Sequence, residues 1–222
     1  MSAQTHQDYL ETTIQDEIVW LLPEKAIYLP KYHTCVIADL HIGKLSTFRK
    51  AGIGIPLEGE NENWQQLTYL LLNYPVKTCV FLGDLIHSDY NKECNTLVEI
   101  LEQFPDVKFI LTEGNHDVHS KYHLERIDQL EIVDDYGLGP FLFTHIPLET
   151  SDEGLYNVAG HIHPAVRLRG RGRDRMKLPC FFVSTDQMLL PAFGNFTGSK
   201  SLNPHKDDRI FACTGNKVIQ VQ

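Results

Sequence analysis

The sequence has few cysteines, no long apolar run and a shortage of positive charge. The five cysteines among the 222 residues are scattered and odd in number, and none form a CxxC pair. This excludes a disulfide framework and a zinc site of that type. No apolar stretch is long enough to cross a membrane, and the polar, acidic start MSAQTHQDYLETTIQDE is unlike a secretory signal. We therefore expect a cytoplasmic protein with reduced thiols and no membrane contact.

The chain carries 29 acidic and 20 basic residues, a net charge of −9. Such a chain is not, on average, attracted to nucleic acid. One segment is the exception, with only Asp174 opposing its positive charges: Arg167, Arg169, Arg171, Arg173, Arg175 and Lys177. A basic run can be a solvated, mobile loop or a phosphate-binding segment, and the sequence leaves both interpretations open.

The length and the 42% hydrophobic content fit one α/β domain over 1–222, in which 1–17 can form a flexible N-terminal segment. Residues 18–30 have the pattern of two short strands around a Pro-Glu-Lys turn. Apolar residues at helical spacing predict two amphipathic helices, one through Trp64, Leu67 and Leu71, the other through Leu97, Leu101 and Phe104. Apolar stretches after the basic run predict late strands that complete a second sheet.

Five apolar runs of strand length each end in a residue type that binds metals. CVIA, CVFL, KFILTE, FLFT and NVA precede, in turn, Asp39, Asp84, Asn115, His145 and His161. A continuous apolar run indicates a strand buried on both faces. Because ligands of open α/β sheets gather beyond the carboxyl ends of strands, we expect these side chains to share one site.

Imidazole and carboxylate together suit Mn, Fe or Zn. Two such ions about 4 Å apart can clamp a phosphate and activate a water. Asp84, at the centre of the set, is our choice for the bridging carboxylate. In an extended backbone residues i and i+2 point to the same side, so Asp39 with His41, and His161 with His163, can each address one site.

The stretch Gly114-Asn115-His116-Asp117 is the sharpest single motif. Asn115 offers an amide oxygen to a metal, and His116 can give a proton to a leaving oxygen. Asp117 can orient that imidazole and keep it protonated. Alone, the motif could be a turn, because Gly and Asn are turn formers; its place in an ordered series favours a catalytic role.

The series D-x-H, G-D, G-N-H-D, a lone His and G-H-x-H resembles the calcineurin-like metallophosphoesterases over roughly residues 36–163. The resemblance implies a four-layer α-β-β-α sandwich of two mixed sheets with flanking helices, and a dinuclear centre. It implies one ion on Asp39, His41, Asp84 and His163, and a second on Asp84, Asn115, His145 and His161. It also assigns the general acid to His116.

The stretches LLPEKAIYLP, IADLHIGKLSTFRKAGIGIP, VFLGDLIHS and LPCFF…LLPAFGNFTG look like the ligase-associated DNA damage response endonucleases, the PdeM family. This narrower resemblance implies DNA repair beside a DNA ligase and a helicase. His87 matches a histidine that lies near the substrate phosphate in related double-strand-break repair nucleases. Lys44 and Arg49 are further candidates for phosphate contact, although an ordinary solvated helix face explains them equally well.

The sequence thus predicts a Mn-dependent phosphodiesterase, a DNA endonuclease whose basic segment steadies the strand. One alternative is a phosphomonoesterase or small-molecule phosphodiesterase on the same scaffold, since fold does not settle function. The net charge slightly favours it. Another is a scaffold that keeps the fold without catalysis, but such proteins are expected to lose ligands, and here each ligand position is filled.

Overall fold

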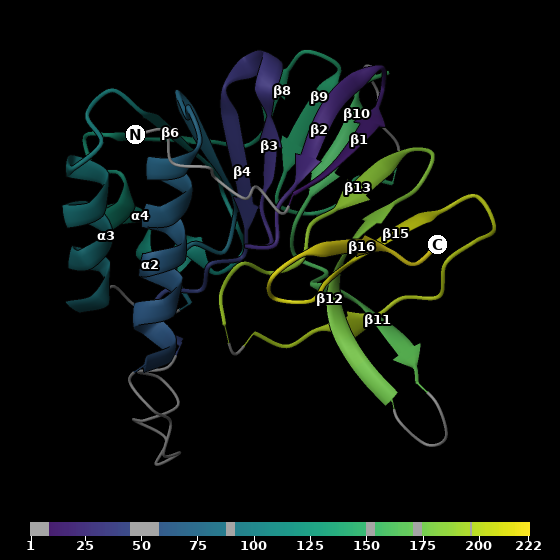
Figure 1. The fold of residues 1–222 in the computed structure, drawn as a ribbon. Coiled ribbons are helices and arrows are strands. Elements are labelled where there is room, and N and C mark those ends of the chain that lie inside the picture. Colours follow the sequence, from purple (N-terminus) through teal and green to yellow (C-terminus); the bar gives the residue numbers. More distant parts are fainter. Residues whose placement is uncertain (1–8, 45–57, 88–91, 150–153, 171–174, 196) are drawn as a thin grey trace, which may run out of the picture.

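The computed structural model describes residues 9–44, 58–87, 92–149, 154–170, 175–195 and 197–222. Its strands form two sheets (Figure 1). The seven-stranded sheet runs in chain order: β1 (Leu10–Ile14), β2 (Glu17–Leu21), β3 (Ile27–Leu29), β4 (Thr34–Ala38), β5 (Thr78–Leu82), β6 (Lys108–Thr112) and β7 (Leu130–Val133). β1 to β4 pair antiparallel, and β4 to β7 pair parallel.

The second sheet has nine strands and is also mixed. It contains β8 (Tyr136–Leu138), β9 (Phe141–Thr144), β10 (Tyr156–Ala159), β11 (Pro164–Arg169), β12 (Arg175–Val183), β13 (Gln187–Leu189), β14 (Lys200–Ser201), β15 (Arg209–Cys213) and β16 (Val218–Gln220). The order is β14-β11-β12-β13-β10-β9-β8, with β15 on β12 and β16 on β15. The predicted late strands are therefore present.

The described helices are α2 (Glu58–Asn73), α3 (Lys92–Glu102) and α4 (Lys121–Leu124), with 3-10 turns at Pro30–Tyr32 and Asp117–Ser120. They lie together on one side of the first sheet (Figure 1). The expected sandwich of two mixed sheets is confirmed. A four-layer arrangement also implies helices on the outer face of the second sheet. Within the described ranges no helix follows Leu124, so this layer is not seen there.

Two apolar cores explain why the central strands are continuously hydrophobic. Alternate residues of β4 and β5 point to opposite faces. Ile37 and Phe81 pack with the helices in one core, whereas Val36 and Val80 pack between the sheets in the other. The predicted helices correspond to α2 and α3, although Phe104 lies two residues beyond the end of α3. Leu67 of α2 is fully buried in the first core.

The expectation of a flexible segment over 1–17 is wrong for its second half. Leu10–Ile14 forms β1, which pairs with β2 along its whole length. The alternating burial of β1 ends in buried Ile14, so this hairpin contributes to the core between the sheets. Residues 1–8 lie outside the described part. The five cysteines are all free and buried. None of the described helices has the length and apolar character needed to cross a bilayer.

Candidate metal centre

The carboxyl ends of five strands meet at one edge of the sandwich. β4, β5 and β6 are parallel neighbours in one sheet, and β9 and β10 are parallel neighbours in the other. The backbone N–H of His161, after β10, donates to both carboxylate oxygens of Asp39, after β4, at 2.9 and 3.1 Å. The strand-end prediction is confirmed, and a direct hydrogen bond joins the two sheets there.

The first of two ligand clusters contains Asp39, His41 and His163, whose donor atoms lie within 4.8 Å of one another. Nε2 of His163 is 3.2 Å from Oδ1 of Asp39. Among the described residues, the buried Nε2 of His41 has no hydrogen-bond partner, and that of His163 has only Asp39, itself a candidate ligand, beside it. A buried polar atom without a partner is costly. Ligation of a cation by these nitrogens removes that cost, so the residues fit a metal.

The second cluster contains Asp84, His145 and His161. Oδ1 of Asn115 is 3.0 Å from Nε2 of His145, which places the amide oxygen in the same group. Asp84 faces both clusters: its Oδ1 is 3.4 Å from Nε2 of His145, and its Oδ2 is 3.7 Å from Nε2 of His41. This is the position that a bridging carboxylate needs.

Backbone carbonyls fix the histidine rings. Nδ1 of His145 donates to the carbonyl oxygen of Leu82 at 3.0 Å, and Nδ1 of His163 donates to that of Gly198 at 2.9 Å. Because Nδ1 carries the proton in both rings, Nε2 keeps its lone pair for a cation. Burial, with the charge of Lys44 next, lowers the pKa of His41 to about 2, so this imidazole is neutral, as a ligand must be.

The motif residues adopt left-handed backbone conformations, so the expectation of extended D-x-H and H-x-H segments is wrong. The φ angles are positive at Asp39, His41, Asp84, His161 and His163. His161 and His163 also belong to different clusters instead of addressing one site together. Non-glycine residues in this region carry strain that surrounding contacts must offset, and such residues concentrate at functional sites.

Glycines let the strand ends approach one another. A Cβ on Gly83 would lie 2.2 Å from Nδ1 of His145, and one on Gly160 would lie 2.7 Å from Oδ2 of Asp39. A Cβ on Gly114 would lie 2.1 Å from the backbone nitrogen of Asp84. The glycines of G-D, G-N-H-D and G-H-x-H therefore serve the packing of the ligand cluster itself.

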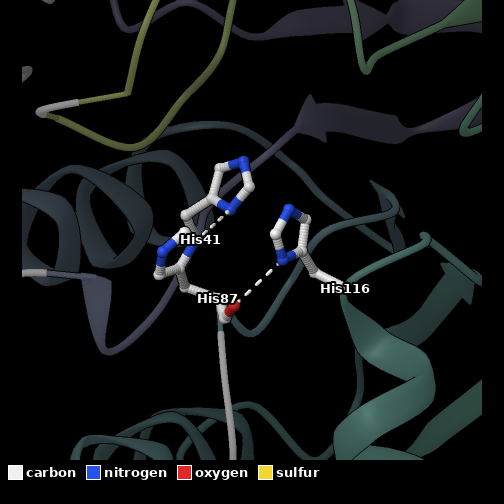
Figure 2. Close-up of side chains that lie close together, drawn as sticks. All are labelled: His41, His87 and His116. Carbon is white, nitrogen blue, oxygen red and sulfur yellow. Dashed lines mark hydrogen bonds between the residues drawn. The ribbon is translucent and has the colours of Figure 1, made fainter. Parts of the chain in front are cut away.

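His41, His87 and His116 form a third group beside the first cluster (Figure 2). Nδ1 of His87 is 3.3 Å from Nδ1 of His41. The rings of His87 and His116 stack with centroids 5.1 Å apart. Nδ1 of His116 donates to the carbonyl oxygen of His87 at 3.0 Å, which leaves Nε2 on the side of Asp84, 4.0 Å from its Oδ2. His116 thus lies half-exposed between this third group and Asp84 of the second cluster.

The role expected for Asp117 is wrong, because this residue does not orient the imidazole of His116. The Asp117 side chain is buried and accepts backbone hydrogen bonds from Ile86 at 2.9 Å and from Gly114 at 3.0 Å. Burial raises the pKa of Asp117 to about 7, and the two backbone hydrogen bonds partly oppose this rise. Asp117 holds the loops that carry Asp84 and Asn115 against each other.

The candidate phosphate contacts have different locations. Lys44 is half-buried beside the centre; burial lowers its pKa, and the nearby charges of Asp84 and Asp39 oppose that shift. Arg167 and Arg169 belong to β11, which begins next to His163. Arg49, Arg171 and Arg173 lie outside the described residues. The flanks of the basic run are paired strands and not a loop, because β11 and β12 form an antiparallel ribbon.

Sequence reasoning missed the structural role of residues 192–195 and 197–199. Phe193 N–H donates to the carbonyl oxygen of Ala38 at 2.7 Å, and Gly194 N–H to that of Asp39 at 3.2 Å. Lys25 Nζ donates to the carbonyl oxygen of Phe193 and to Oδ1 of Asn195. With the Gly198 carbonyl on His163, this segment supports the first cluster by its main chain. The stretch LLPAFGNFTG was the available signal, but it contains none of the usual metal ligands.

The comparisons with known proteins agree with this geometry. The family model described as calcineurin-like phosphoesterase matches residues 32–210. The crystal structure of Pseudomonas putida nuclease MPE is similar with a TM-score of 0.82 and 28% identity, over 96% of this chain and 100% of that one. This likeness is consistent with the narrower resemblance to the ligase-associated family. A protein of unknown function, AQ665 from Aquifex aeolicus, is 20% identical over 63% of this chain and 82% of that one, with a TM-score of 0.43.

The comparison with curated proteins gives no match. The family model covers most of the chain and includes every strand end that carries a candidate ligand. The expected resemblance is therefore confirmed: the chain belongs to the calcineurin-like phosphoesterases and is a metal-dependent phosphoesterase.

Proposed function

We propose that this chain is a dinuclear-metal-dependent phosphodiesterase that cuts DNA internally, with Mn as the preferred ion and Fe or Zn as alternatives. One observation supports the dinuclear part most directly. The two oxygens of Asp84 face Nε2 of His41 in one cluster and Nε2 of His145 in the other. A carboxylate in this position would hold both ions, and the mixed oxygen and nitrogen donors suit these metals.

Asp39, His41, Asp84 and His163 would hold the first ion, and Asp84, Asn115, His145 and His161 the second. Two bound divalent ions supply Lewis-acid activation of a phosphate and of a water nucleophile. The rings that donate from Nδ1 to Leu82 and Gly198 keep Nε2 aimed at the centre. Half-buried Lys44 adds a positive charge for the phosphate.

His116 is the general acid of this proposal. Its Nδ1 proton is held by the carbonyl oxygen of His87 at 3.0 Å. A second proton on Nε2, on the side of Asp84, is therefore free to move to the departing oxygen of the diester. His87 stacks on this ring and contacts His41, so it fixes the positions of both imidazoles.

The similarity to a bacterial nuclease over nearly the whole of both chains supports a nucleic acid as the substrate. The resemblance to the ligase-associated family is the reason to propose DNA. The implied work in DNA repair, and the association with a DNA ligase and a helicase, are part of the same proposal. So is a cytoplasmic location, which the five free buried thiols suit. A phosphomonoesterase is the second candidate, favoured by the net charge of −9, which weakens attraction to a polyanion.

Three substrates tested side by side decide between these candidates: a labelled single-stranded DNA, bis-p-nitrophenyl phosphate and p-nitrophenyl phosphate. Each is incubated with the full chain in Mn and after chelation. We expect cleavage of DNA and of the diester, both abolished by the chelator and restored by Mn. Hydrolysis of the monoester alone would sink the nuclease proposal.

A further inference from the structure

The ribbon of β11 and β12 begins at the metal centre and projects from the sandwich (Figure 1). β11 starts at Pro164, the residue after His163. Its antiparallel register places Arg167 opposite Lys177 and Arg169 opposite Arg175. Because side chains alternate along a strand and directly opposite residues share a face, Arg167, Arg175 and Lys177 lie on one face of the ribbon. We call this set the basic face.

The other face of the ribbon is apolar, with Val166 opposite Leu178 and Leu168 opposite Met176. The strict alternation of basic and apolar residues places the positive charge on one face of the ribbon. A solvated loop does not require this separation, so the pattern indicates a surface that binds a partner.

Like charges directly opposite on neighbouring strands destabilise a sheet. Two exposed lysines elsewhere have carboxylate partners: Lys108 pairs with Glu131, and Lys121 pairs with Glu113. Within the described part of the chain, no carboxylate forms an ion pair with Arg167, Arg175 or Lys177, all of which are exposed. The described residues therefore supply no negative charge that offsets the repulsion between the cations of the basic face. Binding of a polyanion would offset it.

Lys177 links the basic face to the metal centre. Its Nζ donates to the carbonyl oxygen of Ser199. The neighbouring Gly198 carbonyl accepts the hydrogen bond from Nδ1 of His163 at 2.9 Å. The basic face thus borders the segment that orients His163, a candidate ligand. A nucleic-acid strand that leaves the metal centre would contact the basic face next.

We propose that the basic face of the β11–β12 ribbon binds the backbone phosphates of a nucleic-acid strand whose scissile bond lies at the metal centre. The inference rests on the proposed phosphodiesterase function and adds the element that selects polynucleotides over small diesters. At about 3.3 Å per residue, Arg167 and Arg169 lie about 13 and 20 Å along the ribbon from His163. Phosphates are about 3.4 Å apart along one strand of a duplex and further apart on an extended single strand, so the ribbon reaches at most about six nucleotides from the cut.

The test compares the full chain with the double variant Arg167→Gln, Arg175→Gln, which keeps Lys177 because its ammonium bonds to the carbonyl of Ser199 beside the metal centre. The matched control replaces two exposed lysines elsewhere, Lys206→Gln and Lys217→Gln, and so changes the net charge equally. We measure DNA binding by fluorescence anisotropy in the presence of chelator, at several salt concentrations. We also measure kcat/KM in Mn on bis-p-nitrophenyl phosphate and on oligonucleotides of 2 to 20 nucleotides.

The ribbon variant should bind DNA at least 10-fold more weakly, with a salt slope smaller by about 1.4, because two phosphate contacts to a single strand are lost. Its kcat/KM on the small diester should equal that of wild type, and its defect on oligonucleotides should grow with length and level off beyond about six nucleotides. The control should match wild type throughout. Unchanged DNA binding, or an equal loss on the small diester, would overturn the inference.

The two proposals fail in different ways. If wild type binds DNA through the ribbon but hydrolyses no diester in Mn, the proposed function is wrong and the basic face stands as a binding surface. If wild type cuts DNA and the ribbon variant cuts and binds it equally well, the metal centre stands and the basic face is refuted.

Discussion

The backbone N–H of His116 donates a hydrogen bond of 2.9 Å to Oδ1 of Asp84. The same carboxylate has its Oδ2 4.0 Å from Nε2 of the His116 ring. The loop that carries His116, the proposed general acid, is therefore positioned by the carboxylate that faces both ligand clusters. A shift of Asp84 would move His116 as well, so the proposed metal binding and proton donation would be coupled through one residue.

Replacement of His116 separates the two functions. His116→Ala removes the imidazole but keeps the backbone N–H that bonds to Asp84. We expect the variant to hold the same number of ions as wild type and to lose on the order of 10²-fold in kcat on a diester with a poor leaving group. Unchanged turnover would remove His116 from the mechanism. A leaving group that needs no proton, such as p-nitrophenolate, should show a smaller loss.

Asp84→Asn tests the bridging position with little change in shape. Asp84 has a φ of 46°, and Asn tolerates this left-handed region well. The amide keeps one acceptor oxygen but loses the negative charge that faces His41 and His145. We expect metal affinity to fall by more than about 10-fold, the lower end of losses seen even for groups behind the ligands. Exposed Asp106→Asn is the control, and equal metal affinity in both variants would contradict the assignment.

Gly83→Ala tests the close packing of strand ends. The added Cβ would meet the His145 ring at 2.2 Å, and φ at Gly83 is +65°. We expect a loss of about 1–3 kcal/mol in the free energy of unfolding, together with weaker metal binding. Gly137→Ala is the control, because nothing lies within 4 Å of the position of its Cβ. Chemical denaturation and metal titration of both variants measure the effect; two equally stable variants would show that the cluster tolerates the methyl group.

The lowered pKa of Lys25 predicts that the free energy of unfolding depends on pH. Burial lowers its pKa to about 8 in the folded chain, against an ordinary 10.5. Between pH 8 and 10.5 the unfolded chain therefore binds more protons than the folded chain, so the free energy of unfolding rises with pH. Below pH 8 both states are protonated and the contribution is constant.

The difference in unfolding free energy between wild type and Lys25→Met isolates this effect, because other groups titrate alike in both. We expect the difference to rise from pH 8 to 10.5, on the order of 1 kcal/mol after allowance for the partial exposure of the ammonium. Exposed Lys217→Met should show no such rise. A constant difference for Lys25→Met would mean that the ammonium is not desolvated.

Sequence reasoning was correct where a pattern of residues has a single strong structural interpretation. The buried runs before Asp39 and Asp84 could only be strands with both faces covered, and the carboxyl ends of parallel strands converge by topology. The strand-end ligands were therefore predictable as one group. The alternation Val-Arg-Leu-Arg after Pro164 also indicates a strand, although its charge suggested a loop.

Sequence reasoning failed where tertiary contacts override local preference. The left-handed backbone at His41 and His161 is imposed by neighbouring loops, and short motifs do not reveal it. Asp117 stands beside His116 in the chain, but its burial directs both oxygens to backbone N–H groups. The contact of Lys25 with Phe193 joins residues 168 positions apart, which no local pattern can indicate.

The most direct test of the central claim is the number of ions that the chain binds after chelation and dialysis, measured by Mn titration with elemental analysis and with diester hydrolysis followed in parallel. The account predicts two ions per chain, with hydrolysis reaching its maximum only as the second site fills. A chain that binds no divalent ion, or that hydrolyses diesters fully with the chelator present, would contradict it.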